Sequence, residues 1–564
     1  MVDLTKNPFH LDASAIKWVE DTISAMTVEE KIGQLFIHLN TSRDPADMER
    51  ILNGYHVGGM RYLNASPEEI YDQNQFFQTH SKIPLLIASN CEMGGSGGVK
   101  NGTFVATSAQ SGASCTEETA YDAGYVSGVE AEAIGCNWNF APVVDILYNW
   151  RNTIVNTRAY SSDPDRVITL SRKFMEGLSK SNVAACAKHF PGDGVEERDQ
   201  HLLMGTNPFS CEQWDETFGK VYKTLIDEGL PSIMVGHICL PAYSRKFVPG
   251  ILDGDILPAT LAPEIVTGLL RKKLGFNGLV LTDASHMVGM WQHMPRKEQV
   301  PRAIAAGCDM FLFFNDLDED FHYMLEGYQT GIITEERLTD ALRRILGLKA
   351  MLGLHEKHAQ GKLMPPKDNL QRVGCEEHLG LAARAADNAI TLVKDTKHQL
   401  PITPDTHKNI RLYYIGGDVG GLLDSTHEAR EIIIDELTKA GFCVTLNDGN
   451  TKIKGRMDDY HKAVDAAFVF ADIAGYAREN VKRISWAVAQ SNEVPWYAGE
   501  VPTVFVSLNF TTHLYDVPMC RTYINAYGNT REIIRQAILK IMGKSEFKGN
   551  FEDTVWCDKW DTRL

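Results

Sequence analysis

The sequence has few basic residues for its length and no long apolar run. Lysine and arginine number 56 against 73 aspartates and glutamates, which gives a formal net charge of −17 over 564 residues. An acidic surface repels nucleic acid and anionic lipid, so we expect neither a nucleic acid nor a membrane as partner. Because no stretch is apolar enough to span a bilayer and the first residues are polar, we also expect no signal peptide. The expected location is the cytoplasm.

Cysteine pairs of the kind that bind zinc are missing. The eleven cysteines are odd in number, widely scattered and never spaced as C-x-x-C. Most lie inside apolar runs, which is typical of buried free thiols in a reducing compartment. Apolar residues make up 44% and charged residues 23%, which is ordinary globular usage and excludes intrinsic disorder.

Eight short apolar runs alternate with segments of helical periodicity in the first two thirds of the chain. Continuous apolarity is typical of strands buried on both faces, and intervening helices make neighbouring strands parallel. Helices are predicted at 67–80 and 336–352, and Thr27 begins another with a capping-box pattern. Eight such units predict a TIM-like (β/α)₈ barrel, in the α/β class. The predicted strands are 31–39, 56–63, 84–89, 137–146, 183–190, 231–240, 278–284 and 309–314.

A polar segment around Pro365 and Pro366, which cannot continue a helix, separates this series from a second one. We predict a catalytic barrel over residues 1–360, a linker over 361–385 and a second domain over 386–564. Six further strands alternate with helices, as in an open, doubly wound αβα sandwich. These strands are predicted at 389–395, 410–416, 442–448, 466–473, 502–509 and 522–527.

Polar residues lie at or near the carboxyl ends of most of the apolar runs of the predicted barrel. They are Asn90, Asp145, His189, His237, Asp283 and Asn315. Such residues also cap the following helices, but in a parallel barrel the carboxyl ends of the strands are where function gathers. Asp283 is the most distinctive, because a carboxylate at the end of a buried strand can serve as nucleophile or as metal ligand. His286, three residues later, would be a second ligand in the metal alternative.

A second polar constellation follows the fifth predicted strand. Lys188 and His189 end the strand, a turn rich in proline and glycine comes next, and Asp199 and His201 lie on the same loop. An aspartate beside a histidine can fix the imidazole tautomer and raise its basicity, which suits a general acid and base near neutral pH. The alternative is an exposed charged loop, because residues 196–198 are all charged.

Several segments resemble glycoside hydrolase family 3 in its β-N-acetylhexosaminidase branch. The family's KHFPG(H)G-x₄-D-(S/T)-H signature resembles KHFPGDGVEERDQH, and its nucleophile strand resembles GFNGLVLTDASHM. Its substrate-arginine segment resembles GCNWNFAPVVDILYN followed by NTRAYSSDP, and MTVEEKIGQLF and RAIAAGCDMFLF complete the match. The resemblance covers residues 15–350, and AITLVKD extends it into the second domain.

The resemblance implies a TIM-like barrel followed by an αβα sandwich, and a retaining, exo-acting glycosidase without metal or organic cofactor. Asp283 would be the nucleophile, and His201 oriented by Asp199 would protonate the leaving oxygen. No second catalytic carboxylate is then required. The predicted substrate-binding residues are Arg158, Lys188, His189, Asn90, Glu92, His237 and Met287. For His237 a core histidine with its own partners is an equal alternative.

Three positions depart from the family pattern. Asn90 stands where relatives have an aspartate that would accept hydrogen bonds from sugar hydroxyls. Asp193 stands where a histidine is common, and Gln200 where serine or threonine is usual. The changes at Asp193 and Gln200 remove no proton-transfer group. The neutral amide of Asn90 is expected to change the affinity for the sugar or the kind of sugar that is bound.

The expected activity is hydrolysis of a terminal β-linked N-acetylglucosamine or related sugar from a small carbohydrate substrate. One alternative is a phosphorylase or a β-glucosidase with the same site, because a histidine acid/base would not repel an incoming phosphate dianion as a glutamate would. Another is a non-catalytic carbohydrate-binding or regulatory protein, which the change at Asn90 suggests. The sequence is compatible with a homodimer and does not decide the oligomeric state.

Overall fold

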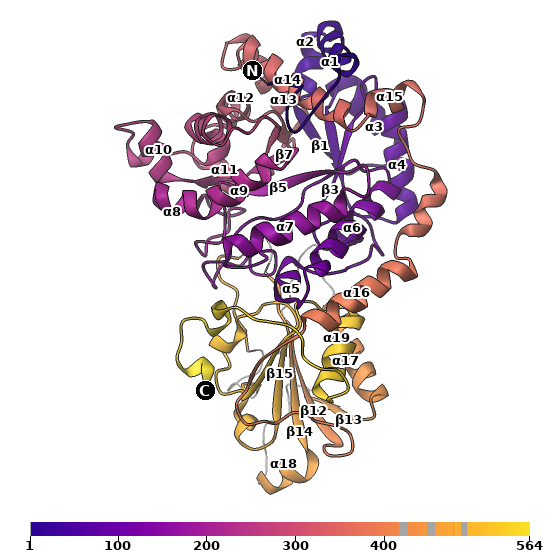
Figure 1. Ribbon diagram of the computed structural model, residues 1–564, viewed down its shortest axis with the longest axis vertical. Helices are drawn as coiled ribbons and strands as arrows, with labels where there is room; N and C mark the ends of the chain where they lie inside the picture. The colour runs from indigo at the N-terminus through magenta and orange to yellow at the C-terminus, as the bar shows by residue number, and fades with distance from the viewer. Residues whose placement is uncertain (1, 417–425, 448–456, 476, 478, 487–492) are drawn as a thin grey trace. The chain divides into compact units, whose positions relative to one another are not determined.

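The computed structural model describes the chain except residues 1, 417–425, 448–456, 476, 478 and 487–492 (Figure 1). Its contacts divide the chain into two compact units. The first comprises 1–104, 120–146 and 163–378, and the second comprises 105–119, 147–162 and 379–564. Residues 361–385 contain η5 (Lys367–Arg372) and most of α16 (Glu376–Ala389). The domain bounds predicted above stay a proposal.

The first unit is a barrel of eight parallel strands (Figure 1). In sheet order they are β10 (Phe311–Leu312), β1 (Phe36–Asn40), β2 (Gly59–Tyr62), β3 (Leu86–Ser89), β4 (Trp138–Asn139), β5 (Ala184–Phe190), β7 (Ser232–Val235) and β9 (Leu279–Thr282). A parallel bridge between Leu281 and Met310 brings the two end strands together, so the barrel is nearly closed. Each predicted run overlaps one of these strands, and the barrel prediction is confirmed. The run 31–39 begins in a helix that ends at Gly33, and β1 extends one residue beyond the run.

Helices follow the strands and surround the barrel (Figure 1). They are α1 (Ala13–Ala25), α2 (Val28–Gly33), α3 (Pro45–Tyr55), α4 (Pro67–His80), α6 (Glu118–Ala133), α7 (Pro164–Leu178), α8 (Cys211–Glu216), α9 (Phe218–Asp227), α10 (Pro241–Phe247), η4 (Glu264–Lys273), α11 (Val288–Trp291), α12 (Arg296–Ala306), α13 (Leu317–Gln329), α14 (Glu335–Met351) and α15 (Leu354–Ala359). Thr27 caps α2 with the predicted capping box. None of the helices that the structure describes combines the length and apolarity needed to cross a bilayer.

The second unit is built on a six-stranded sheet. In sheet order its strands are β11 (Thr391–Asp395), β16 (Thr522–Asn525), β15 (Thr503–Ser507), β14 (Ala466–Asp472), β12 (Asn409–Gly416) and β13 (Cys443–Leu446). Only the β11–β16 pair is antiparallel. The helices of this unit include α5 (Ser108–Ala113), α16, α17 (Thr426–Lys439), α18 (Met457–Ala463) and α19 (Arg531–Ile541). The strand order reverses between β12 and β14, which is the predicted doubly wound arrangement.

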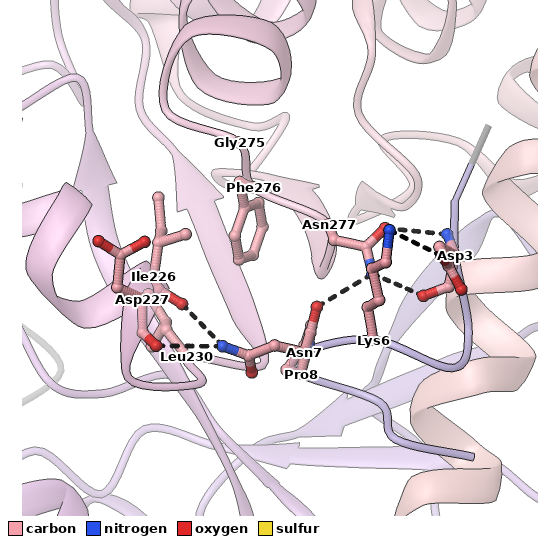
Figure 2. A pocket seen from close by; sticks show the side chains of 10 residues that line it. All are labelled: Asp3, Lys6, Asn7, Pro8, Ile226, Asp227, Leu230, Gly275, Phe276 and Asn277. Atoms are coloured by element: carbon pink, nitrogen blue, oxygen red, sulfur yellow. Dashed lines mark hydrogen bonds and ion pairs between the residues drawn. The ribbon is translucent and has the colours of Figure 1, made fainter. Parts of the chain in front are cut away.

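The N-terminal segment is bound to the amino end of the barrel strands. The Asn277 side chain donates to the carbonyls of Asp3 at 2.8 Å and Asn7 at 3.0 Å, and the Asn7 side chain donates to the Ile226 carbonyl at 3.2 Å. A cavity of about 400 Å³ lies among these residues (Figure 2). Because Asn277 and Leu230 precede β9 and β7, this cavity is at the opposite end of the barrel from Asp283.

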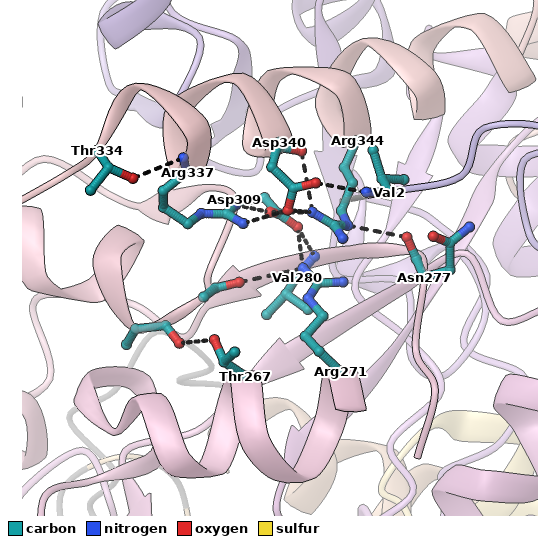
Figure 3. Close-up of polar contacts among 12 residues, drawn as sticks. Val2, Thr267, Arg271, Asn277, Val280, Asp309, Thr334, Arg337, Asp340 and Arg344 are labelled. Carbon is teal, nitrogen blue, oxygen red and sulfur yellow. Dashed lines mark hydrogen bonds and ion pairs between the residues drawn. The ribbon is translucent and has the colours of Figure 1, made fainter. Parts of the chain in front are cut away.

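A buried ion network holds the same end of the barrel (Figure 3). Asp309, at the start of β10, is fully buried and binds Arg271 of η4 at 2.6 Å as well as Arg337 of α14. Asp340 of α14 binds Arg337 at 2.8 Å and also binds Arg344. Burial lowers the pKa of Arg271 to about 10. Because removing one partner of a buried pair leaves an uncompensated charge, this network makes the closure of the barrel sensitive to each of its members.

The burial of Lys349 in α14 leads to a predicted pH dependence of the free energy of unfolding. Its side chain is fully buried, and its ammonium donates to Gln34 Oε1 at 2.7 Å. Burial lowers the pKa of Lys349 from 10.5 to about 7. Between these pH values the unfolded chain binds more protons than the folded chain, so the free energy of unfolding rises with pH across this window. The expected rise is on the order of 4 kcal/mol.

We expect Lys349→Met to abolish this rise, because methionine carries no proton to lose. Denaturant unfolding of both proteins at a series of pH values from about 7 to 10 measures the effect. The difference in free energy of unfolding, wild type minus variant, should increase with pH. A difference that stays constant over this range would contradict the assignment.

Candidate active site

Asp283 lies directly after β9, at the carboxyl end of the barrel strands. Its residue surface is 8% exposed, and its Oδ1 accepts the Ala284 N–H at 2.7 Å. Burial alone raises the pKa of this carboxyl, whereas charge on His189, His237 and His201 lowers it. The Ala284 N–H lowers it further, and the net pKa is below the usual value. The carboxylate is therefore held in the ionised form that a nucleophile requires.

His189 lies beside this carboxylate at the end of β5. Its Nε2 is 3.9 Å from Asp283 Oδ2, and its Nδ1 is 2.6 Å from Asp145 Oδ2. Asp145 is fully buried and also accepts the backbone N–H groups of His189 at 3.1 Å and Asp193 at 2.8 Å. Asp145 therefore fixes the ring of His189. The sequence indicated Asp145 only as a strand-end residue and assigned it no role.

Lys188 and Glu92 form a buried ion pair, with Lys188 Nζ 2.7 Å from Glu92 Oε1. Glu92 lies on the loop after β3 and Lys188 on β5, so the fold brings together two residues predicted to bind the sugar. The backbone N–H of Glu92 donates to the Asn90 carbonyl at 3.0 Å. Asn90 Oδ1 accepts from Arg61 Nε at 3.3 Å, a partner that no sequence pattern indicated.

Asp199 and His201 are in contact on the loop after β5. Asp199 Oδ1 accepts from His201 Nδ1 at 2.7 Å and from the His201 backbone N–H at 2.9 Å. The Asp199 side chain is fully buried, whereas the His201 side chain is 25% exposed. With the proton on Nδ1 donated to Asp199, Nε2 is the basic nitrogen of the neutral ring.

Gln200 ties this loop to two strand ends. Its Oε1 accepts the His237 N–H at 2.8 Å, and its Nε2 is 3.4 Å from Asp193 Oδ2. The two residues that depart from the family pattern on this loop therefore contact each other. Because the backbone of Asp193 also donates to Asp145, one chain of hydrogen bonds connects the His201 loop to the group that fixes His189.

His237 has a protein partner at each ring nitrogen. Nδ1 is 3.0 Å from Thr260 Oγ1, and Nε2 is 3.0 Å from the Ala284 carbonyl. Because a carbonyl only accepts, Nε2 carries the proton, and burial lowers the pKa of His237. These contacts favour a positioning role for His237, next to Asp283, and its binding of the substrate stays a prediction.

The remaining predicted residues differ in placement. Met287 is buried in the turn between β9 and α11, where its N–H donates to the Ala284 carbonyl at 3.0 Å. Arg158 lies in the segment 147–162 that packs with the second unit, and its role stays a prediction from the resemblance. His286 Nε2 is 2.7 Å from the Phe314 carbonyl. Within the described ranges, no group of three or more His, Cys, Asp or Glu side chains is placed to hold a metal ion.

Comparisons with known proteins agree on one family. The model of the glycosyl hydrolase family 3 N terminal domain matches residues 27–348. The chain is 41% identical to a β-N-acetylglucosaminidase/β-glucosidase of Cellulomonas fimi over 569 residues, which span 100% of both chains. The solved structure of the β-glucoside phosphorylase BglX bound to 2FGlc matches with a TM-score of 0.92 and 36% identity, over 97% of this chain and 98% of that one.

A family 3 β-N-acetylglucosaminidase from Paenibacillus shares the fold, with a TM-score of 0.78 at 24% identity over 93% of this chain and 98% of that one. The family model covers more than half of the sequence, and the relative from Cellulomonas fimi is similar over its whole length. The chain belongs to glycosyl hydrolase family 3.

Proposed function

We propose that this chain is a retaining enzyme that removes a terminal β-linked N-acetylglucosamine or glucose from small glycosides. The observation that carries the proposal is the ionised, largely buried Asp283 at the carboxyl end of the barrel, whose pKa is lowered by charge on His189, His237 and His201. Both sugars appear in the name of the relative from Cellulomonas fimi. A nucleophilic carboxylate and a separate proton donor are the two groups that retaining cleavage needs.

In the first step, Asp283 attacks the anomeric carbon and the glycosidic bond breaks. The leaving oxygen takes a proton from His201, whose Nδ1 is held by Asp199 Oδ1 at 2.7 Å. The product is a covalent ester between the sugar and Asp283. In the second step, an oxygen of the acceptor attacks the anomeric carbon and releases the Asp283 carboxylate, while the proton of the acceptor passes to His201 Nε2 and restores the acid form. Two inversions leave the β configuration unchanged.

The groups around Asp283 can orient the sugar for this attack. The Lys188 ammonium and the Glu92 carboxylate are nearly buried and 2.7 Å apart, so together they offer a donor and an acceptor to vicinal hydroxyls. His189 is fixed by Asp145 with Nε2 3.9 Å from Asp283 Oδ2, which suits a contact with the hydroxyl or acetamido group next to the anomeric carbon. Orientation of this kind accounts for a large part of enzymatic rate enhancement.

Phosphate is a second candidate for the acceptor. Two observations favour it. The proposed acid/base is a histidine paired with a buried aspartate, and a similar structure, 36% identical over nearly all of both chains, is named a β-glucoside phosphorylase. A neutral imidazole does not repel an incoming dianion, whereas a glutamate would. With phosphate as acceptor the product is a β-configured sugar 1-phosphate instead of the free sugar.

The test is to incubate aryl β-glucosides and aryl β-N-acetylglucosaminides with the enzyme, with and without phosphate. The proposal requires release of the aryl group from at least one of them with retained configuration. Phosphorolysis predicts a sugar 1-phosphate whose yield rises with phosphate concentration, and hydrolysis predicts free sugar alone. No aryl release under either condition would contradict the proposal as a whole.

Asn90→Asp is expected to raise kcat/KM for the simple aryl glycoside about fivefold. An ionised aspartate can accept from Arg61, as Asn90 Oδ1 does at 3.3 Å, and it binds a sugar hydroxyl more strongly than an amide does. The gain corresponds to about 1 kcal/mol, the usual difference between charged and neutral hydrogen bonds. Asn315→Asp, which adds the same charge after another barrel strand, is the matched control. Unchanged kcat/KM for both sugars would show that Asn90 does not touch the substrate.

A further inference from the structure

An apolar surface lies beside the loop that carries His201. Val288 and Trp291, at the two ends of the short helix α11, are 45% and 44% exposed. Leu202, Leu203 and Met204, which follow His201 directly, are half-buried. Exposed apolar side chains that gather at one place on a surface, rather than singly, commonly mark a binding site.

Helix α11 is held directly against the His201 loop by three contacts. The Val288 N–H donates to the His201 carbonyl at 2.9 Å. Gly289 packs so closely on this loop that a Cβ there would lie 2.4 Å from the Gln200 carbonyl oxygen. Gln292, just after the helix, accepts the Met204 N–H at 3.3 Å. The exposed apolar residues are therefore fixed relative to the proposed acid/base group.

The ring of Trp291 is fixed as well. Its Nε1–H donates to the Ser285 carbonyl at 2.5 Å, and the guanidinium of Arg296 lies over the ring, 5.5 Å from the ring centre. Arg296 is itself held by Asp320 through two hydrogen bonds of 2.7 and 2.6 Å. Arg296 covers one face of the ring, and Trp291 as a whole residue is 44% exposed. The ring therefore offers a preformed aromatic surface to a ligand. A ring held in place loses little conformational entropy on binding.

We propose that Val288 and Trp291 bind the leaving group of the substrate and select for a six-membered ring with a flat apolar face. An aryl group and the C–H face of a sugar share this chemistry. The inference rests on the proposed function, because it takes His201 as the group that protonates the leaving oxygen. When His201 protonates the leaving oxygen, that oxygen is within hydrogen-bond distance of His201. The leaving group, which is attached to this oxygen, therefore lies close to α11.

The test compares Trp291→Ala and Val288→Ala with wild type on three β-glycosyl substrates of the same sugar. They are a methylumbelliferyl glycoside, a β-linked disaccharide and a glycosyl fluoride, whose leaving group is too small to reach α11. We expect Trp291→Ala to lower kcat/KM about tenfold for the two ring-bearing substrates, the size of a good aromatic contact. For the fluoride we expect less than a twofold change, and for Val288→Ala an intermediate loss on the ring-bearing substrates.

Two controls accompany these variants. Trp291→Phe keeps an aromatic face without the indole N–H and should retain most of the activity on ring-bearing substrates. Trp560→Ala removes an exposed tryptophan of the second unit and should change nothing. A loss for only one ring-bearing substrate would identify which ring the surface selects.

Other results would overturn the inference. Equal loss of kcat/KM on the fluoride and on the ring-bearing substrates would mean that Trp291 only supports the His201 loop. Unchanged kcat/KM on all three would mean that it touches no leaving group. Conversion of a dimeric wild type to a monomer by Trp291→Ala, measured by light scattering, would assign the surface to a second copy of the chain. A wild type that cleaves none of the three would instead refute the proposed function.

Discussion

Asp283→Ala is expected to reduce turnover of aryl β-glycosides by roughly 10⁴-fold or more, because it removes the group proposed to form the covalent intermediate. The fold should survive, since the Asp283 carboxylate lies at the strand ends and not in the ion network at the other end of the barrel. Steady-state kinetics with the purified variant measures the loss. Circular dichroism and the thermal midpoint check the fold.

Azide distinguishes a missing nucleophile from a damaged site. In the alanine variant azide can attack the anomeric carbon from the face that the Asp283 carboxylate occupies in the wild type. One inversion then gives an α-glycosyl azide and restores part of the turnover. Asp283→Asn should be as inactive as Asp283→Ala. Because the asparagine side chain fills the space that azide would occupy, azide should not restore its turnover. An alanine variant that keeps more than a tenth of wild-type turnover would refute the nucleophile assignment.

His201→Ala should have the second largest effect, and its size should depend on the leaving group. General acid catalysis is typically worth 10²–10⁴-fold, and less is needed when the leaving group is itself acidic. We expect a loss in that range for alkyl or sugar leaving groups and less than about tenfold for a dinitrophenyl leaving group. A plot of log kcat/KM against the pKa of the leaving group should therefore be steeper for the variant than for wild type.

Asp199→Asn tests whether the dyad acts as a unit. The asparagine can still contact Nδ1 but carries no negative charge opposite the ring, so the variant should reproduce much of the leaving-group dependence of His201→Ala. His286→Ala is the control, because it removes a histidine three residues from Asp283 that binds the Phe314 carbonyl and has no proposed role in proton transfer. A loss that is equal across the leaving-group series in His201→Ala would assign His201 a structural role.

The fold could be predicted because strands that are buried on both faces consist mainly of apolar residues. Every residue of β5, β7 and β9 is buried, and these segments are mainly apolar without alternation, with Lys188 and His189 near the end of β5 as the charged or titratable exceptions. The extent of a strand was harder to predict. The run 137–146 is mainly apolar, yet β4 spans only Trp138–Asn139. Pro142 lacks an N–H for the ladder, and the later residues join β5 through an isolated bridge at Val143.

The candidate site could be predicted where the topology of the barrel decides it. Asp283 follows β9, His189 lies near the end of β5, and Asp145 follows β4 and the bridge at Val143, so the fold alone places them at one end of the barrel. Contacts between side chains from distant segments could not be predicted. The Arg61 partner of Asn90 and the Gln200 contact with Asp193 depend on loop conformations that no local pattern encodes. The assignment of segments 105–119 and 147–162 to the second unit could not be predicted either, because it too depends on contacts between distant parts of the chain.

Covalent labelling tests the central claim most directly. A 2-deoxy-2-fluoro glycoside with a good leaving group forms the glycosyl-enzyme but slows its breakdown, so the labelled protein can be digested and its peptides analysed by mass spectrometry. We predict one added sugar per chain, located on Asp283, and no label in Asp283→Ala. A label on Glu92, Asp145 or any other carboxylate, with the aryl group still released, would contradict the account.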